Sequence, residues 1–227
     1  MQKNTIFFLL LIFVSSCATK VPLNSSYFSQ ENAKKVGLLI NVNKIGVART
    51  GSQGLLEMVA TPGNKFKIAV DSIENDVKPD EVIKKMYLDI FASKSKSITL
   101  IEEHIDFKQV PSFETTDTQK KYSRKNFTFL KEKYGFDEVL VADVDYGMIL
   151  SYYSFAVINR QMYMSIKSEI VNLTDNSLIF KENSRFIADI EKEWNTPPVY
   201  ENLKKSLKNA EIQTLELEKA KFNNSAQ

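Results

Sequence analysis

Histidine and cysteine each occur once in this sequence of 227 residues, as His104 and Cys17. One residue of each type excludes a multi-histidine zinc site, and a single cysteine cannot form an intrachain disulfide. His104 lies among Glu102, Glu103 and Asp106, so we expect it to be a surface side chain. Carboxylates are therefore the main candidates for any chemistry.

A large excess of charge of one sign is also missing. The chain has 30 basic and 28 acidic side chains, which gives a formal net charge of +2. A balance this close excludes a strong general attraction to nucleic acid, so no nucleic-acid partner is expected. Hydrophobic residues at 43% and charged residues at 26% are typical of a globular protein.

Long apolar runs are absent except near the start of the chain. Nine residues without a polar side chain, Ile6 to Val14, follow Lys3 and precede Ser15-Ser16-Cys17. The run is too short to span a bilayer, and small residues follow it, so the pattern predicts a secretory signal over residues 1–16. An ordinary signal that happens to contain a cysteine is the alternative.

The order Val14-Ser15-Ser16-Cys17 resembles the signal of bacterial lipoproteins. The resemblance implies cleavage before Cys17, a diacylglyceryl group on its sulfur and a third acyl chain, such as palmitate, on its amine. Ala18 replaces the aspartate that commonly retains such proteins in the inner membrane. The resemblance therefore implies anchoring in the outer membrane, facing the periplasm, with no cofactor beyond the covalent lipid.

Composition divides the remaining ~210 residues into a tether, one body and a tail. Residues 17–35 are polar and contain Pro22, which predicts a flexible tether with a reach of roughly 23 Å. Residues 36–195 are expected to form the globular domain, and residues 196–227 a C-terminal helix and tail.

Glycine and proline gather between Lys44 and Lys67, which predicts a long loop with at most one helical turn. Its centre is a candidate contact with a partner, formed by Gly51, Ser52, Gln53, Gly54 and Leu55. The same Gly-x-x-Gly segment could cradle an anion. It lacks the lysine and the strand-to-helix frame of a phosphate-binding loop, however.

Hydrophobic periodicity predicts an α+β fold with one mixed sheet covered by helices, in the order β-α-β-α-β-β-β-α. Residues 148–158 are expected to be a connection between strands. The expected strands are residues 36–43, 98–101, 138–146, 162–171 and 178–187, and the expected helices are residues 79–91, 118–134 (ended by Gly135) and 197–221.

Two acidic side chains on one predicted strand are the clearest candidates for chemistry. Asp143 and Asp145 share a face, with Cα atoms about 6.5–7 Å apart. That separation suits an acid/base pair or a divalent metal. It equally suits ion pairs with Lys167 and Arg185 on neighbouring strands, which is the interpretation we favour. The aromatic residues Tyr152, Tyr153 and Phe155 are instead candidates for binding a small ligand or the cell wall.

Two segments resemble lipoproteins similar to the curli-secretion channel subunit and the penicillin-binding-protein activators. They are residues 134–141 (YGFDEVLV), a helix end followed by a strand, and residues 170–179 (IVNLTDNSLI), a strand, turn and strand. This chain has Asp175-Asn176 where the family usually has Thr-Gly. We expect a non-enzymatic envelope protein that binds a protein partner or itself. A hydrolase or metal enzyme using Asp143 and Asp145 is the alternative.

Overall fold

The computed structural model describes residues 20–29, 34–51, 63–153, 156–191, 193–197 and 199–223. These residues form one mixed six-stranded sheet in the order β3-β1-β4-β5-β6, with β2 also paired to β4. The predicted α+β class is confirmed. The strands are β1 (Val36–Val42), β2 (Gly46–Gly51), β3 (Ile98–Leu100), β4 (Glu138–Tyr153), β5 (Ala156–Asn172) and β6 (Leu178–Asp189). The α-helices are α2 (Gly63–Ser72), α3 (Pro79–Ser93), α4 (Phe129–Tyr134) and α5 (Glu201–Asn223).

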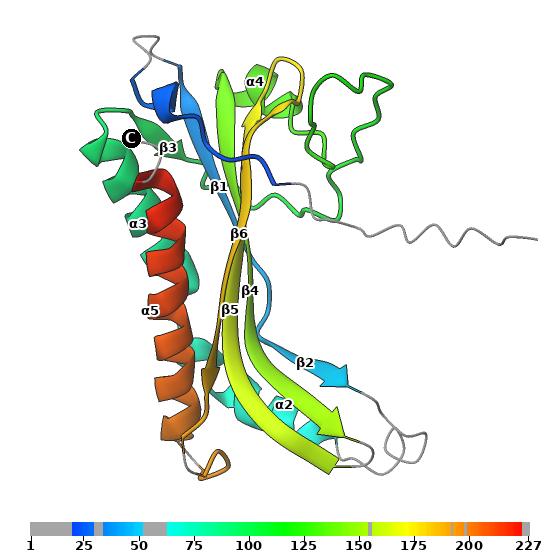
Figure 1. Cartoon of the computed structure of the whole chain (residues 1–227), viewed down its shortest axis with the longest axis vertical. Coiled ribbons are helices and arrows are strands. Elements are labelled where there is room, and N and C mark those ends of the chain that lie inside the picture. Colours follow the sequence, from blue (N-terminus) through cyan, green and yellow to red (C-terminus); the bar gives the residue numbers. More distant parts are fainter. Residues whose placement is uncertain are drawn as a thin grey trace, which may run out of the picture.

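The sheet has two apolar faces of unequal extent. Figure 1 shows α3 and α5 along one face, while α4 and the long loop before it lie against the upper part of the other. The larger core lies under the helices and includes Leu140, Val144 and Met148. The smaller core lies on the opposite face and includes Val139 and Val141. The first residues of β4 are therefore buried on both faces of the sheet, as their continuous apolar run predicts.

The β4–β5 hairpin is much longer than expected. Residues 148–158 were predicted to be a connection, but residues 148–153 and 156–158 belong to the two strands, which stay paired from Glu138↔Asn172 to Tyr153↔Ala156. β4 continues past the end of β1 because β2 takes over as its parallel neighbour, from Gly46↔Gly147 to Gly51↔Tyr152. The prediction was wrong because the partner strand was not recognised.

The predicted loop between Lys44 and Lys67 contains regular structure at both ends. β2 occupies residues 46–51 and α2 begins at Gly63. Gly46 and Gly51, which suggested a loop, lie in β2, whose backbone pairs with that of β4. The residues of the expected helical turn, 55–59, lie outside the described part of the chain.

Only the last turns of the helix predicted over residues 118–134 form, as α4. Gly135 ends it in the left-handed conformation, with φ of 71°, as predicted. The preceding residues are irregular because the side chain of Asn176 provides hydrogen bonds for their backbone. It donates to the carbonyls of Ser123 and Lys125 at 3.1 and 2.9 Å, and accepts from the Phe127 amide at 3.0 Å.

Residues 20–29 pack against the body rather than forming a free tether. Val21 and Lys181 exchange backbone hydrogen bonds of 2.9 and 2.8 Å at the outer edge of β6. Leu23 and Tyr27 are buried, and Phe28 packs edge-on against Phe91 of α3. The polar composition of this segment concealed these apolar contacts, which is why a flexible tether over residues 17–35 was expected.

The predicted helices α3 and α5 are confirmed with small changes in their bounds. α5 buries Leu203, Leu207 and Ala210, but Leu217 of the predicted stripe is 45% exposed. Its place in the core is taken by Glu218, which accepts hydrogen bonds from Tyr87 and Ser184. In the described part of the chain, no helix is long and apolar enough to cross a membrane.

Candidate functional site

Asp143 and Asp145 lie on the same face of β4, as predicted, just beyond the region covered by the loop and α4. Asn41 and Asn43 extend from the end of β1 toward them. The Asn41 amide donates to Asp143 at 2.8 Å, and the Asn43 amide donates to Asp143 at 3.2 Å and to Asp145 at 2.9 Å. These side-chain hydrogen bonds link β1 to β4 at the point where the backbone pairing of the two strands ends.

Lys167 completes this network, whereas Arg185 does not enter it. The Lys167 ammonium lies 2.7 Å from Asp145, so this predicted ion pair is confirmed. The hydrogen bond to Asp145 raises the pKa of Lys167, against a smaller opposing effect of burial. Arg185 lies over the ring of Tyr163, 5.5 Å from its centre, so its predicted ion pair with the carboxylates was wrong.

This geometry suits a structural network better than catalysis. One Asp143 oxygen and both Asp145 oxygens accept hydrogen bonds from fixed amide or ammonium groups, which compete with a metal ion or a substrate proton. The described residues contain no group of three or more His, Cys, Asp or Glu placed to hold a metal.

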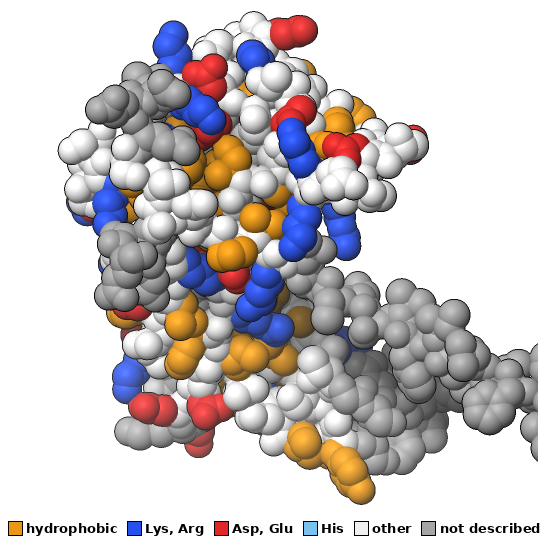
Figure 2. Space-filling view, turned by 45° about the horizontal axis from the view of Figure 1, so that its top comes forward, with side chains coloured by type: hydrophobic (Ala, Val, Ile, Leu, Met, Phe, Trp, Pro, Cys, Tyr) orange, Lys and Arg blue, Asp and Glu red, His pale blue; other side chains and the backbone are white. Residues whose placement is uncertain are grey.

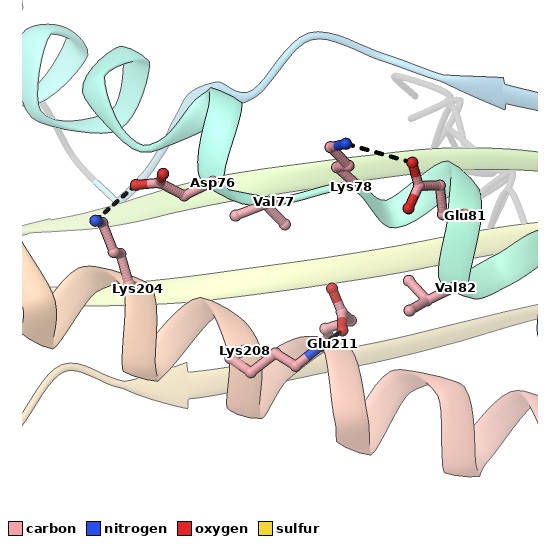
Figure 3. Close-up of a pocket in the computed structure, with 8 residues that line it drawn as sticks. All are labelled: Asp76, Val77, Lys78, Glu81, Val82, Lys204, Lys208 and Glu211. Atoms are coloured by element: carbon pink, nitrogen blue, oxygen red, sulfur yellow. Dashed lines mark hydrogen bonds and ion pairs between the residues drawn. The ribbon is translucent and has the colours of Figure 1, made fainter.

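A cleft of about 400 Å³ lies between the helices on the other face of the sheet (Figure 3). Asp76, Val77, Lys78, Glu81 and Val82 line one side of it, and Lys204, Lys208 and Glu211 of α5 line the other. Three carboxylates and three lysines therefore offset one another.

The carboxylates of this cleft already have partners. Lys204 lies 2.6 Å from Asp76, Lys78 lies 3.4 Å from Glu81, and Lys208 donates to the buried Glu211. A ligand would have to displace an existing ion pair to enter. The cleft therefore offers no uncompensated charge or free donor set to recognise a small molecule.

Large apolar side chains are exposed at the distal end of the β4–β5 hairpin. Tyr153 is 75% exposed and Ile158 is 63% exposed, while Tyr152 is buried on the opposite face. On α2, which lies beside this half of the hairpin in Figure 1, Ile68 is 53% exposed. Figure 2 shows hydrophobic side chains protruding at this end of the molecule. Of the three aromatic candidates, Tyr153 is available for binding and Phe155 lies outside the described residues.

At the opposite end of the sheet, the buried carboxylate of Glu138 holds the N-terminal segment. The Tyr27 hydroxyl donates to it at 2.8 Å, and the ammonium groups of Lys34 and Lys96 lie 2.7 and 3.8 Å away. Burial, reinforced by the carboxylate, raises the pKa of Tyr27 far above its usual value. Burial also lowers the pKa of Lys96, although Glu138 opposes that effect. This cluster fixes where the chain enters the body.

Several predicted site residues cannot be placed. Cys17 and residues 52–55 of the candidate contact segment lie outside the described part of the chain. Gly51, the first residue of that segment, ends β2 opposite Tyr152. The segment therefore starts beside the distal end of the hairpin. His104 is exposed, as predicted.

Two features of the structure were missed in the sequence. Tyr27 and Glu138 are far apart in sequence, and neither lies in a recognisable motif. Arg160 lies over the stacked rings of Phe66 and Trp194, 5.7 and 5.6 Å from their centres. The Trp194 indole thus packs on α2.

No protein-family model matches this sequence, and no curated protein is similar to it. Solved structures with a partial likeness include a PelC dodecamer from Paraburkholderia phytofirmans, with 8% identity, coverage of 87% of this chain and 92% of that chain, and a TM-score of 0.27. A putative neuraminyllactose-binding hemagglutinin homolog from Helicobacter pylori has 12% identity, coverage of 92% and 95%, and a TM-score of 0.34. Lipoprotein GNA1162 from Neisseria meningitidis has 15% identity, coverage of 77% and 96%, and a TM-score of 0.28. Likenesses this weak assign neither a family nor a function to this chain. The resemblance to curli-secretion lipoproteins stays a prediction.

Proposed function

We propose that this chain is a lipid-anchored protein of the outer membrane, facing the periplasm, that binds a protein partner through the distal end of its β4–β5 hairpin. The exposure of Tyr153 and Ile158 carries this proposal. Exposed apolar groups that gather at one end of a molecule are typical of an interaction surface. The lipid anchor is inferred from Val14-Ser15-Ser16-Cys17.

The hairpin places this surface far from the point where the anchor enters the body. Val21 pairs with Lys181, which lies level with Glu169 and Val141 across the sheet. Tyr153 lies twelve positions after Val141 on β4, a distance of about 40 Å along a strand. The proposed contact surface and the anchor therefore occupy different parts of the molecule and can be tested separately.

Photo-crosslinking in the native host tests the contact. A photoreactive amino acid replaces Tyr153 in one variant and Phe129 in a matched control, because Phe129 is an exposed aromatic residue on α4. We expect a discrete crosslinked protein from position 153 and none from position 129. Ile158→Lys should abolish the product, whereas Ile212→Lys, at an exposed apolar position of α5, should leave it unchanged.

Crosslinks to lipid alone, or equal protein products from both positions, would overturn the proposed contact.

The anchor is tested separately by Cys17→Ala. This variant should remain an unprocessed precursor that does not acquire the acyl chains. Each buried CH₂ contributes about 0.8 kcal/mol, so several chains hold the wild type on the membrane. Normal maturation and unchanged membrane partitioning of the variant would contradict the anchor.

A further inference from the structure

The chain enters the body beside a basic segment, residues 117–125, whose exposed cations are Lys120, Lys121 and Arg124. Lys20 lies next to Val21 at the outer edge of β6, and the Lys121 ammonium donates to the Lys20 carbonyl at 3.0 Å. The Lys121 carbonyl in turn accepts from the Leu178 amide at 2.8 Å, which fixes the segment against the start of β6. The entry point and the basic segment are therefore adjacent.

Chain length restricts how far this surface can stand from the lipid. Three peptide units separate Cys17 from Lys20, which span at most about 11 Å even when fully extended. If Cys17 carries the lipid, Lys20 stays within about one headgroup layer of the membrane surface. This step rests on the proposed lipid anchor.

The charges around the entry point leave a local positive excess. Lys20 pairs with Glu182 at 3.6 Å, and Lys120 pairs with Asp175 at 2.8 Å. Lys121 and Arg124 are exposed and form no ion pair within the described part of the chain.

Two further charges of the segment offset one another. Asp117 accepts a hydrogen bond from Tyr122 and Lys125 donates to the Val110 carbonyl, and neither forms an ion pair within the described residues. Glu114 adds one exposed carboxylate, next to Phe113, whose amide donates to the Arg124 carbonyl at 2.9 Å. The two cations Lys121 and Arg124 therefore leave a net excess of about one positive charge near the entry point.

We infer that the surface formed by Lys20, Lys120, Lys121 and Arg124 lies against anionic lipid headgroups and sets the orientation of the body on the membrane. Each uncompensated cation close to an anionic surface favours the bound orientation about fivefold, so a net excess of one charge favours it by that factor. A free tether would permit all orientations, whereas the fixed segment of residues 20–29 does not.

Two matched glutamines allow the orientation to be measured on the full, lipidated protein. Gln119 lies in the basic segment and Gln213 on the exposed side of α5, and both are exposed. Gln119→Cys and Gln213→Cys each introduce one reactive thiol, since the only native cysteine would carry the lipid. A fluorophore on each thiol is then quenched by spin-labelled headgroups in vesicles of phosphatidylethanolamine and phosphatidylglycerol.

We expect quenching several-fold stronger at position 119 than at position 213. The difference should shrink in vesicles of phosphatidylcholine alone and at high salt. Lys121→Glu/Arg124→Glu should remove it, while Lys85→Glu/Lys205→Glu, with the same change of charge at exposed sites on α3 and α5, should not. Unfolding curves that match those of the wild type show that the variants fold.

Equal quenching at both positions, or a preference that survives Lys121→Glu/Arg124→Glu, would overturn the orientation while leaving the anchor intact. Failure of the unmutated protein to float with the vesicles would instead overturn the anchor, and the orientation with it. The two failures are distinguishable because flotation depends on the lipid alone.

Discussion

Replacing Gly147 by alanine should be among the most damaging single changes in the sheet. Gly147 is the residue of β4 that meets Gly46 where β2 begins, and its φ is +144°. A Cβ added there would lie 2.0 Å from the Gly46 carbonyl oxygen and 2.7 Å from its nitrogen. Both are backbone atoms, so β2 itself would have to move.

The strained backbone conformation and the steric clash together set the expected loss of stability. A non-glycine residue in a sparsely populated backbone conformation costs about 1–3 kcal/mol, and overpacking costs about 1–3 kcal/mol more. Gly147→Ala should therefore lower the free energy of unfolding by about 2–6 kcal/mol, a large part of the roughly 5–15 kcal/mol typical of a whole protein.

Urea unfolding followed by circular dichroism measures this loss. Gly46→Ala is the matched control, because the nearest atom to its added Cβ is the Lys44 carbonyl oxygen at 3.9 Å. Without a clash, the control should change stability by less than about 1 kcal/mol. If both variants unfold at the same urea concentration as the wild type, the close approach of β2 to β4 at this point is refuted.

Three further predictions concern the polar and buried groups. Asp143→Asn/Asp145→Asn should fold, stay anchored and lose at most about 1–2 kcal/mol in urea unfolding, because the Asp145 carboxylate is 34% exposed and such ion pairs contribute little; loss of function in a folded double variant would favour the enzyme alternative. Val141→Asp should prevent folding, seen as loss of soluble protein, because it buries an unpaired charge. The folded protein keeps Tyr27 protonated beside Glu138 after the unfolded chain ionises it near pH 10, so stability should fall as the pH rises above about 10. Tyr27→Phe should reduce that slope by about 1.4 kcal/mol per pH unit, and an unchanged slope would contradict the buried contact.

Elements whose own residues determine their conformation were predicted correctly. Pro79 and the apolar spacing after it specify α3, and Gly135 ends α4 with a positive φ that few other residues adopt. The turn before β6 follows from residues 174–177, where the Asp175 side chain accepts a hydrogen bond from the Ser177 amide at 3.1 Å. The α+β class followed from the order of these local signals.

Elements that depend on distant partners were not predicted. β2 is a strand because β4 lies beside it, although its own glycines favour a loop. Residues before α4 have a composition that suits a helix, but Asn176 supplies hydrogen bonds for their backbone from about 50 residues away. For the candidate site, the Asp145–Lys167 pair followed from strand alternation, whereas Asn41 and Asn43 required the parallel pairing of β1 with β4.

The N-terminal segment gives the strongest connection between the fold and the proposed location. A tether with a reach of roughly 23 Å would separate the lipid from the body. Instead, Val21 is bonded to β6 and Tyr27 to the first residue of β4, so these residues are held against the body. If Cys17 carries the proposed lipid, the anchor holds the sheet as well as the chain near the membrane. Because the hairpin is continuous with that sheet, the fold would then set the position of its exposed end relative to the membrane.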